Sequence, residues 1–384
     1  MDRPTHTFDL MQLEMLALNW LQMLVCLSSG VMVGFSAMAD PLLGSSDRDE
    51  SAEPLVLIAE HPDSMDQYHP NAEVVGQMFQ SLLLATTGES TVSEAWAHFI
   101  LPDDRVGFKI LSEPGRLSGT RPAVVEAVIS SLLSTGFPPD QVVIWDRRLG
   151  SLMATGYQDL AQKLRVKLAG AQDAGYDDSV FHEAPLVGSL VFGDHEFGKD
   201  GEGVGRRSFV SNLVTQELTR LIVIHPMLNH YLGGVHGNLV GLVAASVDNF
   251  HRFLIGGTQY YQAVPEIFAM EALYDKLAFV LCDGLICQYQ GEDRGFLQYS
   301  NLMHRLMIGV DPVAMDVLSF GELSRLRHSA DLPVDEKIRL LYENAQLLEL
   351  GMADSQKIRS QYIQLPSILK NNGSRTLQAP SSAP

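Results

Sequence analysis

RVGFKILSEPGRLSGTRPAVVEAVISSLLSTGFPPDQVVIWD, residues 105–146, has the pattern of a strand, a helix and a second strand. Residues 105–112 and 141–145 are short apolar runs, which are typical of buried strands. Between them, residues 120–135 place apolar side chains at 124, 125, 128, 129, 132 and 133, the spacing of one buried helical face. A strand–helix–strand unit predicts two parallel strands and an α/β fold.

The same alternation continues on both sides of this unit. We expect further strands at residues 54–60, 189–192, 220–224 and 277–282, and helices at 71–87, 311–327 and 333–350. Residues 54–350 are therefore predicted to form a single α/β domain, with a mainly parallel sheet flanked by helices. The stretch 147–215 is rich in glycine and charged residues, and we expect it to be a less regular insertion.

The two ends of the chain differ from this domain. Residues 16–35 are almost entirely apolar and are followed by Ala37-Met38-Ala39 and Asp40-Pro41. Small residues at the two positions that signal peptidase reads predict a signal peptide over 1–39, with an uncleaved anchor or a cytoplasmic helix as alternatives. We therefore expect an exported protein, periplasmic or extracellular. Residues 40–53 have the composition of a linker, and 366–384 that of a flexible tail.

Charge and cysteine content exclude several kinds of partner and cofactor. The 46 acidic and 27 basic residues give a formal net charge of −19, which argues against nucleic acid and anionic membranes as partners. Three cysteines are too few for a four-thiolate cluster, so we expect no iron–sulfur cluster in this chain. Cys282 and Cys287 either form a disulfide in an oxidising compartment or remain core thiols. The glycine-rich nucleotide motifs and the Gly-x-Ser-x-Gly elbow are absent from the sequence.

Ligands of open α/β sheets bind beyond the carboxyl ends of the strands, so the residues there are candidates for a site. After strand 105–112, Arg116 and Arg121 flank a helix start where Thr120 is the expected N-cap. This combination suits a carboxylate or a phosphate, with a capped helix and two solvated arginines as the alternative. Asp146 ends the next strand and is either functional or paired with its neighbouring arginines. Lys109, inside an apolar strand, must be paired, face a cavity or lie at an exposed edge.

The densest polar segment follows strand 220–224 and runs from residue 225 to 241. Its histidines, His225, His230 and His236, offer acid–base groups or metal ligands, and its glycines allow a ligand to approach the backbone. The histidine spacings are five and six, whereas two zinc ligands on one helix face need four. We therefore leave the cofactor open, a divalent metal included, and a hydrogen-bonding polar loop that contains Asn238 is the simpler interpretation.

Three aspartates complete the set. Asp283 ends strand 277–282, and Asp311 is the expected N-cap of a helix with proline at its first position. Asp316 lies among apolar residues and needs a partner, either Arg325, a loop N–H or a bound ligand. We expect the groups that follow the strands to converge on one crevice, in particular Thr120, Asp146, His230 and Asp283.

The order of these candidate residues along the chain resembles that of the domain-of-unknown-function family number 362. The resemblance covers roughly 105–325, and its most specific element is the Asp-Pro-x-Ala-x-Asp segment at 311–316. Its other elements are strand Val106–Leu111, Thr120-Arg121-Pro122, Asp146, Asn229-His230 with Gly237-Asn238, and Asp283-Gly284 with Gln290-Gly291. The chain departs from the family pattern at the lysine before the loop histidine, at the asparagine after Lys109 and at the histidine between Thr120 and Pro122.

The resemblance implies no settled activity. Members of the family are often exported, and some carry ferredoxin-like cysteine motifs that this chain lacks. A distant similarity to the N-terminal half of the nickel-pincer lactate racemase family implies a small hydroxy acid or a similar anion as ligand.

We therefore expect an exported enzyme that acts on a small anionic metabolite at the carboxyl edge of the sheet. The expected catalytic residues are His230, Asp283, Asp316 and Lys109. The expected ligand-binding residues are Thr120, Arg121, Arg116, Asp146, Asn238, His236 and Asp311. A non-catalytic protein that binds a small ligand, and a redox or assembly partner of iron–sulfur relatives, are the alternatives.

Overall fold

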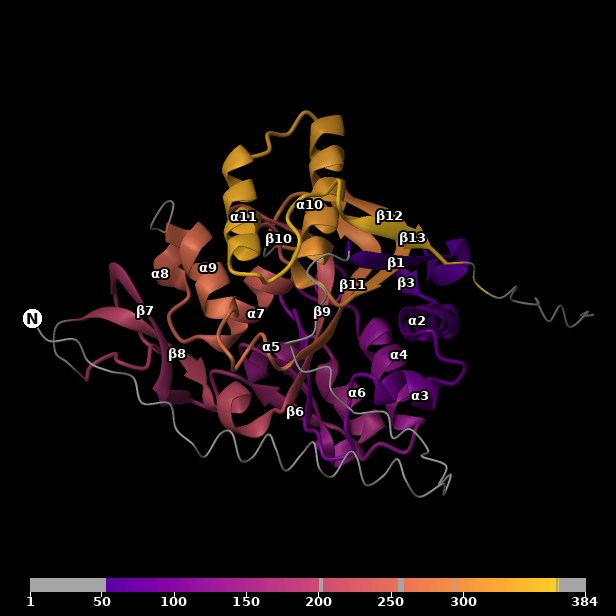
Figure 1. Ribbon diagram of the computed structural model, residues 1–384, viewed down its shortest axis with the longest axis horizontal. Helices are drawn as coiled ribbons and strands as arrows, with labels where there is room; N and C mark the ends of the chain where they lie inside the picture. The colour runs from indigo at the N-terminus through magenta and orange to yellow at the C-terminus, as the bar shows by residue number, and fades with distance from the viewer. Residues whose placement is uncertain (1–52, 200–202, 255–258, 293, 364, 366–384) are drawn as a thin grey trace, which may run out of the picture. The chain divides into compact units, whose positions relative to one another are not determined.

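A mainly parallel nine-stranded sheet runs through the part of the chain that the computed structural model describes, residues 53–199, 203–254, 259–292, 294–363 and 365 (Figure 1). In order across the sheet, its strands are β13 (Arg359–Tyr362), β1 (Leu55–Glu60), β12 (Ser300–Gly309), β11 (Leu277–Gln288), β9 (Arg220–His230), β4 (Val106–Ile110), β5 (Val142–Asp146) and β6 (Lys167–Gly170), with β10 (Gly234–Val235) beside β9. Only β12 and β10 pair antiparallel with their neighbours. The predicted α/β fold with a mainly parallel sheet is confirmed.

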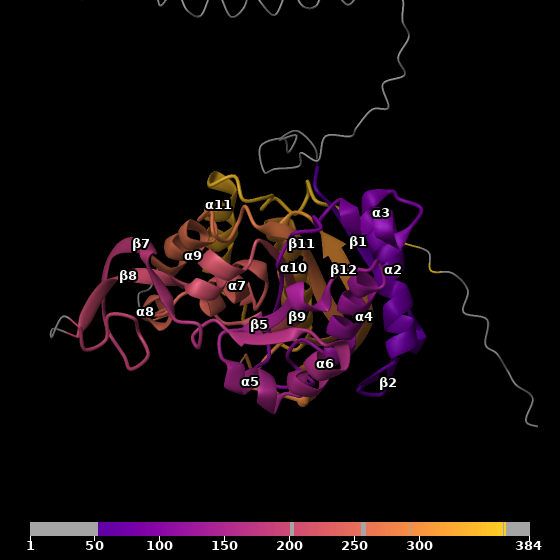
Figure 2. The ribbon, with the colours of Figure 1, turned by 90° about the horizontal axis from the view of Figure 1, so that it is seen from below.

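Two layers of helices cover the two faces of this sheet (Figures 1 and 2). One layer consists of α2 (Ala72–Thr87), α3 (Val92–Ala97), α4 (Pro122–Leu133), α5 (Leu149–Ala154) and α6 (Tyr157–Leu164), and the other of α7 (Asn238–Ser246), α9 (Tyr260–Phe268), α10 (Pro312–Ser329) and α11 (Arg339–Leu347). Side chains of β9 alternate between the layers, with Ile222 and Ile224 in the first core and Leu221 and Val223 in the second. The central strands are therefore buried on both faces.

The unit that predicted the fold is present with one correction. Helix α4 buries Val124, Val125, Val128, Ile129 and Leu132, as the spacing predicts. The helix starts one residue later than a cap at Thr120 requires, because Arg121 occupies the N-cap position and makes no side-chain cap. The Thr120 hydroxyl instead accepts from Leu111 N at 3.0 Å and donates to Ile224 O at 2.8 Å, which joins the end of β4 to the middle of β9.

Residues 147–215 contain more regular structure than expected. Helices α5 and α6 and strand β6 extend the central unit, and β7 (Tyr176–Ser189) and β8 (Val204–Ser211) form a separate two-stranded antiparallel ribbon. The strand predicted at 189–192 is wrong beyond Ser189. There the chain turns, because the Asp194 carboxylate accepts from Val191 N at 2.8 Å and Gly193 takes a φ of 103°.

Strand β9 is longer than predicted and carries two of the histidines. It continues from Ile224 to His230 because β11 pairs with it in parallel as far as Leu228 and β10 folds back on its last residues. His225 is therefore a buried strand residue, and His230 is the last residue of the strand rather than part of a loop. Cys282 and Cys287, both in β11, are buried free thiols.

The remaining predictions concern the two ends. The predicted helix over 333–350 is a 3₁₀ turn at Glu336–Ile338 followed by α11, because Asp335 caps the turn by accepting from Lys337 N. The predicted signal peptide, the tail 366–384 and the linker up to residue 52 lie outside the described residues. Within the described residues, no helix combines the length and the apolar character needed to cross a membrane.

Candidate functional site

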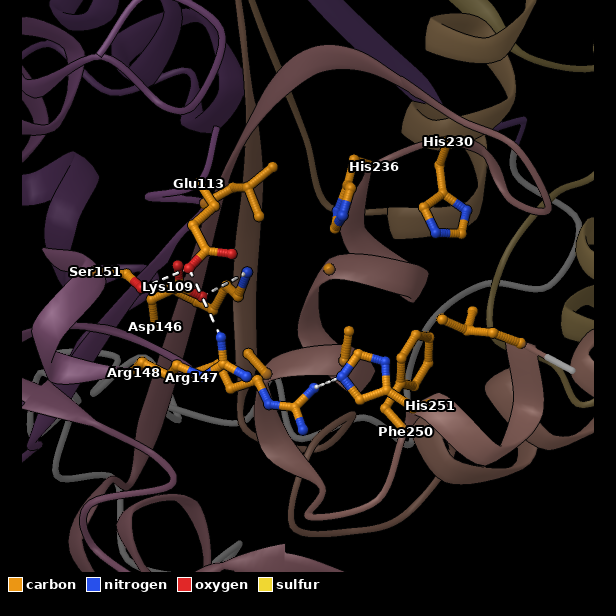
Figure 3. Close-up of a pocket in the computed structure, with 15 residues that line it drawn as sticks. Lys109, Glu113, Asp146, Arg147, Arg148, Ser151, His230, His236, Phe250 and His251 are labelled. Atoms are coloured by element: carbon orange, nitrogen blue, oxygen red, sulfur yellow. Dashed lines mark hydrogen bonds and ion pairs between the residues drawn. The ribbon is translucent and has the colours of Figure 1, made fainter. Parts of the chain in front are cut away.

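A cavity of about 130 Å³ opens at the carboxyl edge of the sheet, and we refer to it as the strand-end pocket (Figure 3). Lys109 comes from β4, Asp146 from β5, His230 from β9 and His236 from the segment after β10. Helix α7 closes one side with Gly241 and two alanines. The pocket therefore forms where three neighbouring strands end, as expected for a parallel sheet.

Lys109 and Asp146 form a buried ion pair in this pocket. Only 2% of Lys109 and 6% of Asp146 is exposed, and Lys109 Nζ lies 3.5 Å from Asp146 Oδ1. The other oxygen of Asp146 accepts from Ser112 N at 2.8 Å and from Ser112 Oγ at 2.6 Å. Burial lowers the pKa of Lys109, and the charge of Asp146 opposes this shift. The ammonium group is therefore held by one carboxylate in a place that favours its neutral form.

Two histidines stand across the pocket from this pair. The ring of His230 lies 5.1 Å from that of His236 in an edge-to-face arrangement. Gly233 N donates to His230 Nδ1 at 2.9 Å, so the neutral ring carries its proton on Nε2. A Cβ atom on Gly241 would lie 3.6 Å from Lys109 Nζ and 3.9 Å from His236 Nδ1. The absence of a side chain at Gly241 therefore leaves room between the lysine and the histidine.

The rim of the pocket is held by contacts between segments far apart in the chain. Arg148 Nη1 lies 3.9 Å from Glu113 Oε1, which also accepts from Ser151 Oγ at 2.6 Å. Arg147 Nη1 lies 3.4 Å from His251 Nε2, and its Nη2 donates to the Asp248 carbonyl at 2.9 Å. Burial lowers the pKa of Arg147, but a guanidinium keeps its charge at any physiological pH. The rim therefore places two permanent cations at the mouth.

Segment 247–251 also connects the rim to the β7–β8 ribbon. The Asp248 carboxylate accepts from Phe209 N of β8 and from His195 N, each at 2.9 Å. Val247 forms a β-bridge with Val210 of the same strand. Phe250 and His251, which follow directly, line the strand-end pocket. The position of this part of the rim therefore depends on the ribbon.

Arg121 and Asp283 form a second buried pair outside the pocket. Arg121 Nη1 lies 2.8 Å from Asp283 Oδ1, and Arg121 N donates to Asp283 Oδ2 at 2.9 Å. Both residues are almost fully buried, and neither lines the strand-end pocket. The predicted single crevice is therefore corrected: Asp146 and His230 share it, whereas Thr120 and Asp283 join neighbouring segments through hydrogen bonds within the protein.

Asp316 fixes the start of helix α7. Its Oδ1 accepts from Asn238 N and Nδ2 at 2.8 and 2.9 Å, and its Oδ2 accepts from Leu239 N at 3.0 Å. A loop N–H is thus the partner that this aspartate requires. Burial raises the pKa of Asp316 to about 7, although the three hydrogen bonds lower it. A Cβ on Gly237 would lie 2.1 Å from Asp316 Oδ1, so this close approach needs glycine.

His225 lies next to this carboxylate, behind the pocket. Its Nε2 is 4.0 Å from Asp316 Oδ1 and makes no hydrogen bond, while Nδ1 contacts the Pro226 carbonyl at 3.2 Å. Burial lowers the pKa of His225 to about 4, and the nearby Lys109 and His236 add to this shift. Between about pH 4 and pH 7 the pair therefore consists of two neutral groups, with its one titrating proton on the carboxyl.

The other predicted residues have structural contacts. Asp311 caps α10 by accepting from Ala314 N at 2.8 Å and also accepts from Met352 N at 2.9 Å, so its predicted cap is confirmed. Arg116 donates to the Thr155 carbonyl at 2.9 Å and lines a different cavity beside α4. The predicted site residues within the strand-end pocket are thus four: Lys109, Asp146, His230 and His236.

Six polar or aromatic residues of the pocket were missed among the predicted site residues: Glu113, Arg147, Arg148, Ser151, Phe250 and His251. The two arginines follow Asp146 directly, so their position after a strand was a usable signal. Glu113 carried the same signal, because it directly follows the predicted strand 105–112, whereas long-range packing brings Ser151, Phe250 and His251 to the rim. Within the described residues, no group of three or more His, Cys, Asp or Glu side chains is arranged to hold a metal ion.

Comparisons with known proteins do not place the chain in a family. No family model and no curated protein matches the chain. A crystal structure of a protein from Thermotoga maritima, a structural genomics target, is similar with 11% sequence identity and a TM-score of 0.37. The match covers 71% of this chain and 61% of that one.

Proposed function

We propose that this protein is an enzyme that binds a small anionic metabolite in the strand-end pocket and moves a proton with Lys109 as base. The observation that carries the proposal is the placement of Lys109, 2% exposed and lining the pocket, with Asp146 as its one ion-pair partner among the described residues. Burial lowers the pKa of Lys109, which makes loss of its proton easier and so favours a role as proton acceptor once the anion is bound.

The charges around the pocket favour an anion. Lys109, Arg147 and Arg148 outnumber the two carboxylates, Glu113 and Asp146, in a chain whose formal net charge is −19. A cavity of about 130 Å³ is close to the size that holds one benzene molecule, about 150 Å³. Acetate, phosphate and two- to four-carbon hydroxy or keto acids are therefore the ligand class that fits.

Binding is tested by titration calorimetry with sodium acetate and inorganic phosphate. We expect one of these anions to bind saturably, with a free energy of about −4 kcal/mol because the ligands are so small. Lys109→Met should weaken binding at least about tenfold, and Arg148→Gln about fivefold since this arginine is exposed. Arg339→Gln is the matched control, because it removes an equal charge from an exposed position on α11.

Two outcomes contradict the proposal in different ways. If neither anion binds, or if Lys109→Met and Arg148→Gln bind as the wild type does, the pocket is not an anion site. Proton transfer is tested separately by NMR in D₂O, with loss of the signal of a carbon-bound proton in a panel of hydroxy and keto acids. Binding without any exchange would favour a non-catalytic binding protein instead.

A further inference from the structure

His230 forms a wall between two cavities. One of its sides faces the strand-end pocket, and it also lines a neighbouring cavity of about 360 Å³, which we call the second pocket. The end of β9, residues 290–292 and the segment before α11 bound the second pocket. We propose that the second pocket binds an ammonium group, so that the protein holds an anion and an amine on either side of His230. The idea that an anion and an amine bind together rests on the anion site proposed above. The ammonium site itself does not depend on it.

Hydrogen-bond acceptors dominate the polar lining of the second pocket. Gln290 Oε1 is buried and has no hydrogen-bond partner among the described residues. Glu292 and Asp335 add two carboxylates. Arg327 also lines this pocket close to Glu292, but its N–H groups are already engaged: Nε and Nη2 donate to the Pro333 carbonyl and Nη1 to the Tyr289 carbonyl. An ammonium group, with three donors and no acceptor, complements this lining.

The backbone of Glu292 is held in an unfavourable conformation at this pocket. Its φ is 52°, in the left-handed region, which costs a residue with a side chain about 1 kcal/mol. Glu292 N donates at 3.3 Å to Oδ1 of Asn229, a buried residue of β9. Strain of this kind concentrates at ligand sites, where the surrounding structure maintains it. The backbone of Glu292 is thus held at the pocket by a contact to the same strand that ends in His230.

An aromatic ring supplies the remaining feature of an ammonium site. Tyr231 is 44% exposed and lines the second pocket. It stacks on His230 with ring centroids 5.1 Å apart and an angle of 29° between the planes. The faces of aromatic rings attract cations, so Tyr231 adds to the attraction of the two carboxylates. The second pocket therefore differs in charge from the strand-end pocket, where cations predominate.

Titration calorimetry with propylammonium chloride tests the proposal, with potassium chloride at equal ionic strength as the blank. We expect saturable binding to the full-length protein. Glu292→Gln should weaken it about fivefold, as for a partly exposed ion pair, and Tyr231→Leu should weaken it to a smaller degree. Glu343→Gln is the matched control, because this exposed glutamate of α11 does not line the pocket. Glu292→Gly, which relieves the backbone strain, should stabilise the protein and still weaken binding.

The same experiment separates the two sites. Glu292→Gln should change acetate binding to the strand-end pocket far less than propylammonium binding, and Arg148→Gln should change propylammonium binding far less than acetate binding. In the wild type, each ligand should bind more tightly in the presence of the other, by an equal factor, because opposite charges face each other across His230. Absence of propylammonium binding, or equal binding by Glu292→Gln and the wild type, would overturn the ammonium site whatever acetate does.

Discussion

Single substitutions in the buried pair of His225 and Asp316 should uncover two pH dependences of stability that cancel in the wild type. Burial lowers the pKa of His225 from 6.5 to about 4 and raises that of Asp316 from 3.8 to about 7. Between about pH 4 and pH 6.5, the folded pair holds one titrating proton, on Asp316, and the unfolded pair also holds one, on His225. Stability changes with pH only where the folded and unfolded states bind different numbers of protons. The contribution of the intact pair is therefore nearly flat over this range.

In the variant Asp316→Asn, His225 is the only member of the pair that still titrates. A histidine with a lowered folded pKa contributes stability above pH 6.5 that is lost as the pH falls toward about 4. At 1.36 kcal/mol per pH unit, the free energy of unfolding should fall by about 3 kcal/mol over this interval. A constant loss of about 1–2 kcal/mol should accompany it, because an asparagine cannot accept from both Asn238 and Leu239 as the carboxylate does.

His225→Gln has the opposite effect. An aspartate with a raised folded pKa contributes stability below pH 3.8 that is lost as the pH rises through about 7. The free energy of unfolding should therefore fall by about 4 kcal/mol from the lower to the upper end of this range. Lys109 and His236, which face His225, and Asp311, which affects Asp316, are unchanged in each variant.

Urea unfolding at a series of pH values measures these slopes, and subtraction of the wild-type curve removes the other titrating groups. The double variant Asp316→Asn/His225→Gln serves as the control and should again run parallel to the wild type. The reasoning is refuted if either single variant has the same pH dependence as the wild type, or if Asp316→Asn becomes less stable as the pH rises from 4 to 6.5.

Three further substitutions test the packing around the sites. Gly241→Ala should raise the free energy of unfolding in urea by up to about 1 kcal/mol, because α7 gains a helix-favouring residue. It should also weaken acetate binding about tenfold in calorimetry, because the added methyl group would lie 3.6 Å from Lys109 Nζ. An unchanged acetate affinity would show that the ligand binds elsewhere. Gly237→Ala should cost about 3 kcal/mol or more by the same unfolding assay, because its Cβ collides with Asp316, and a near-neutral result would contradict the close approach. Arg121→Met should lower the melting temperature through a loss of about 3–5 kcal/mol, because Asp283 is left buried and unpaired, and Arg121→Met/Asp283→Leu should recover part of that loss.

The fold was predictable where apolar residues repeat at the spacing of a single kind of element, either a helix or a strand. Apolar spacing located β4, α4 and β5 to within a few residues, because strand burial and helix burial leave different periods. The length of β9 was not predictable, since the segment after Ile224 is extended by pairing with β10 and β11, and neither partner is visible in the local sequence.

The site was predictable in part for a related reason. The rule that polar residues after parallel strands meet at one edge brought out Asp146, His230 and His236, and the cost of burying a lysine inside an apolar strand brought out Lys109. The same rule failed for Arg121 and Asp283. Asp283 lies inside β11 rather than at the end of the predicted strand 277–282, because pairing with β9 and β12 extends that strand to Gln288, and it neutralises Arg121 across 162 positions of the chain. Pairing between distant residues decides whether a charged group faces a ligand or the protein, and a single sequence does not contain that information.

The attachment of segment 247–251 to the β7–β8 ribbon has a consequence for local unfolding. A two-stranded ribbon has little stability of its own, so it opens more readily than the nine-stranded sheet. Because Asp248 and Val247 bond to β8, each opening of the ribbon also releases the backbone that carries Phe250 and His251. Amide hydrogens of β8 and of this segment should consequently exchange with solvent as one cooperative unit, ahead of those in β4, β5 and β9.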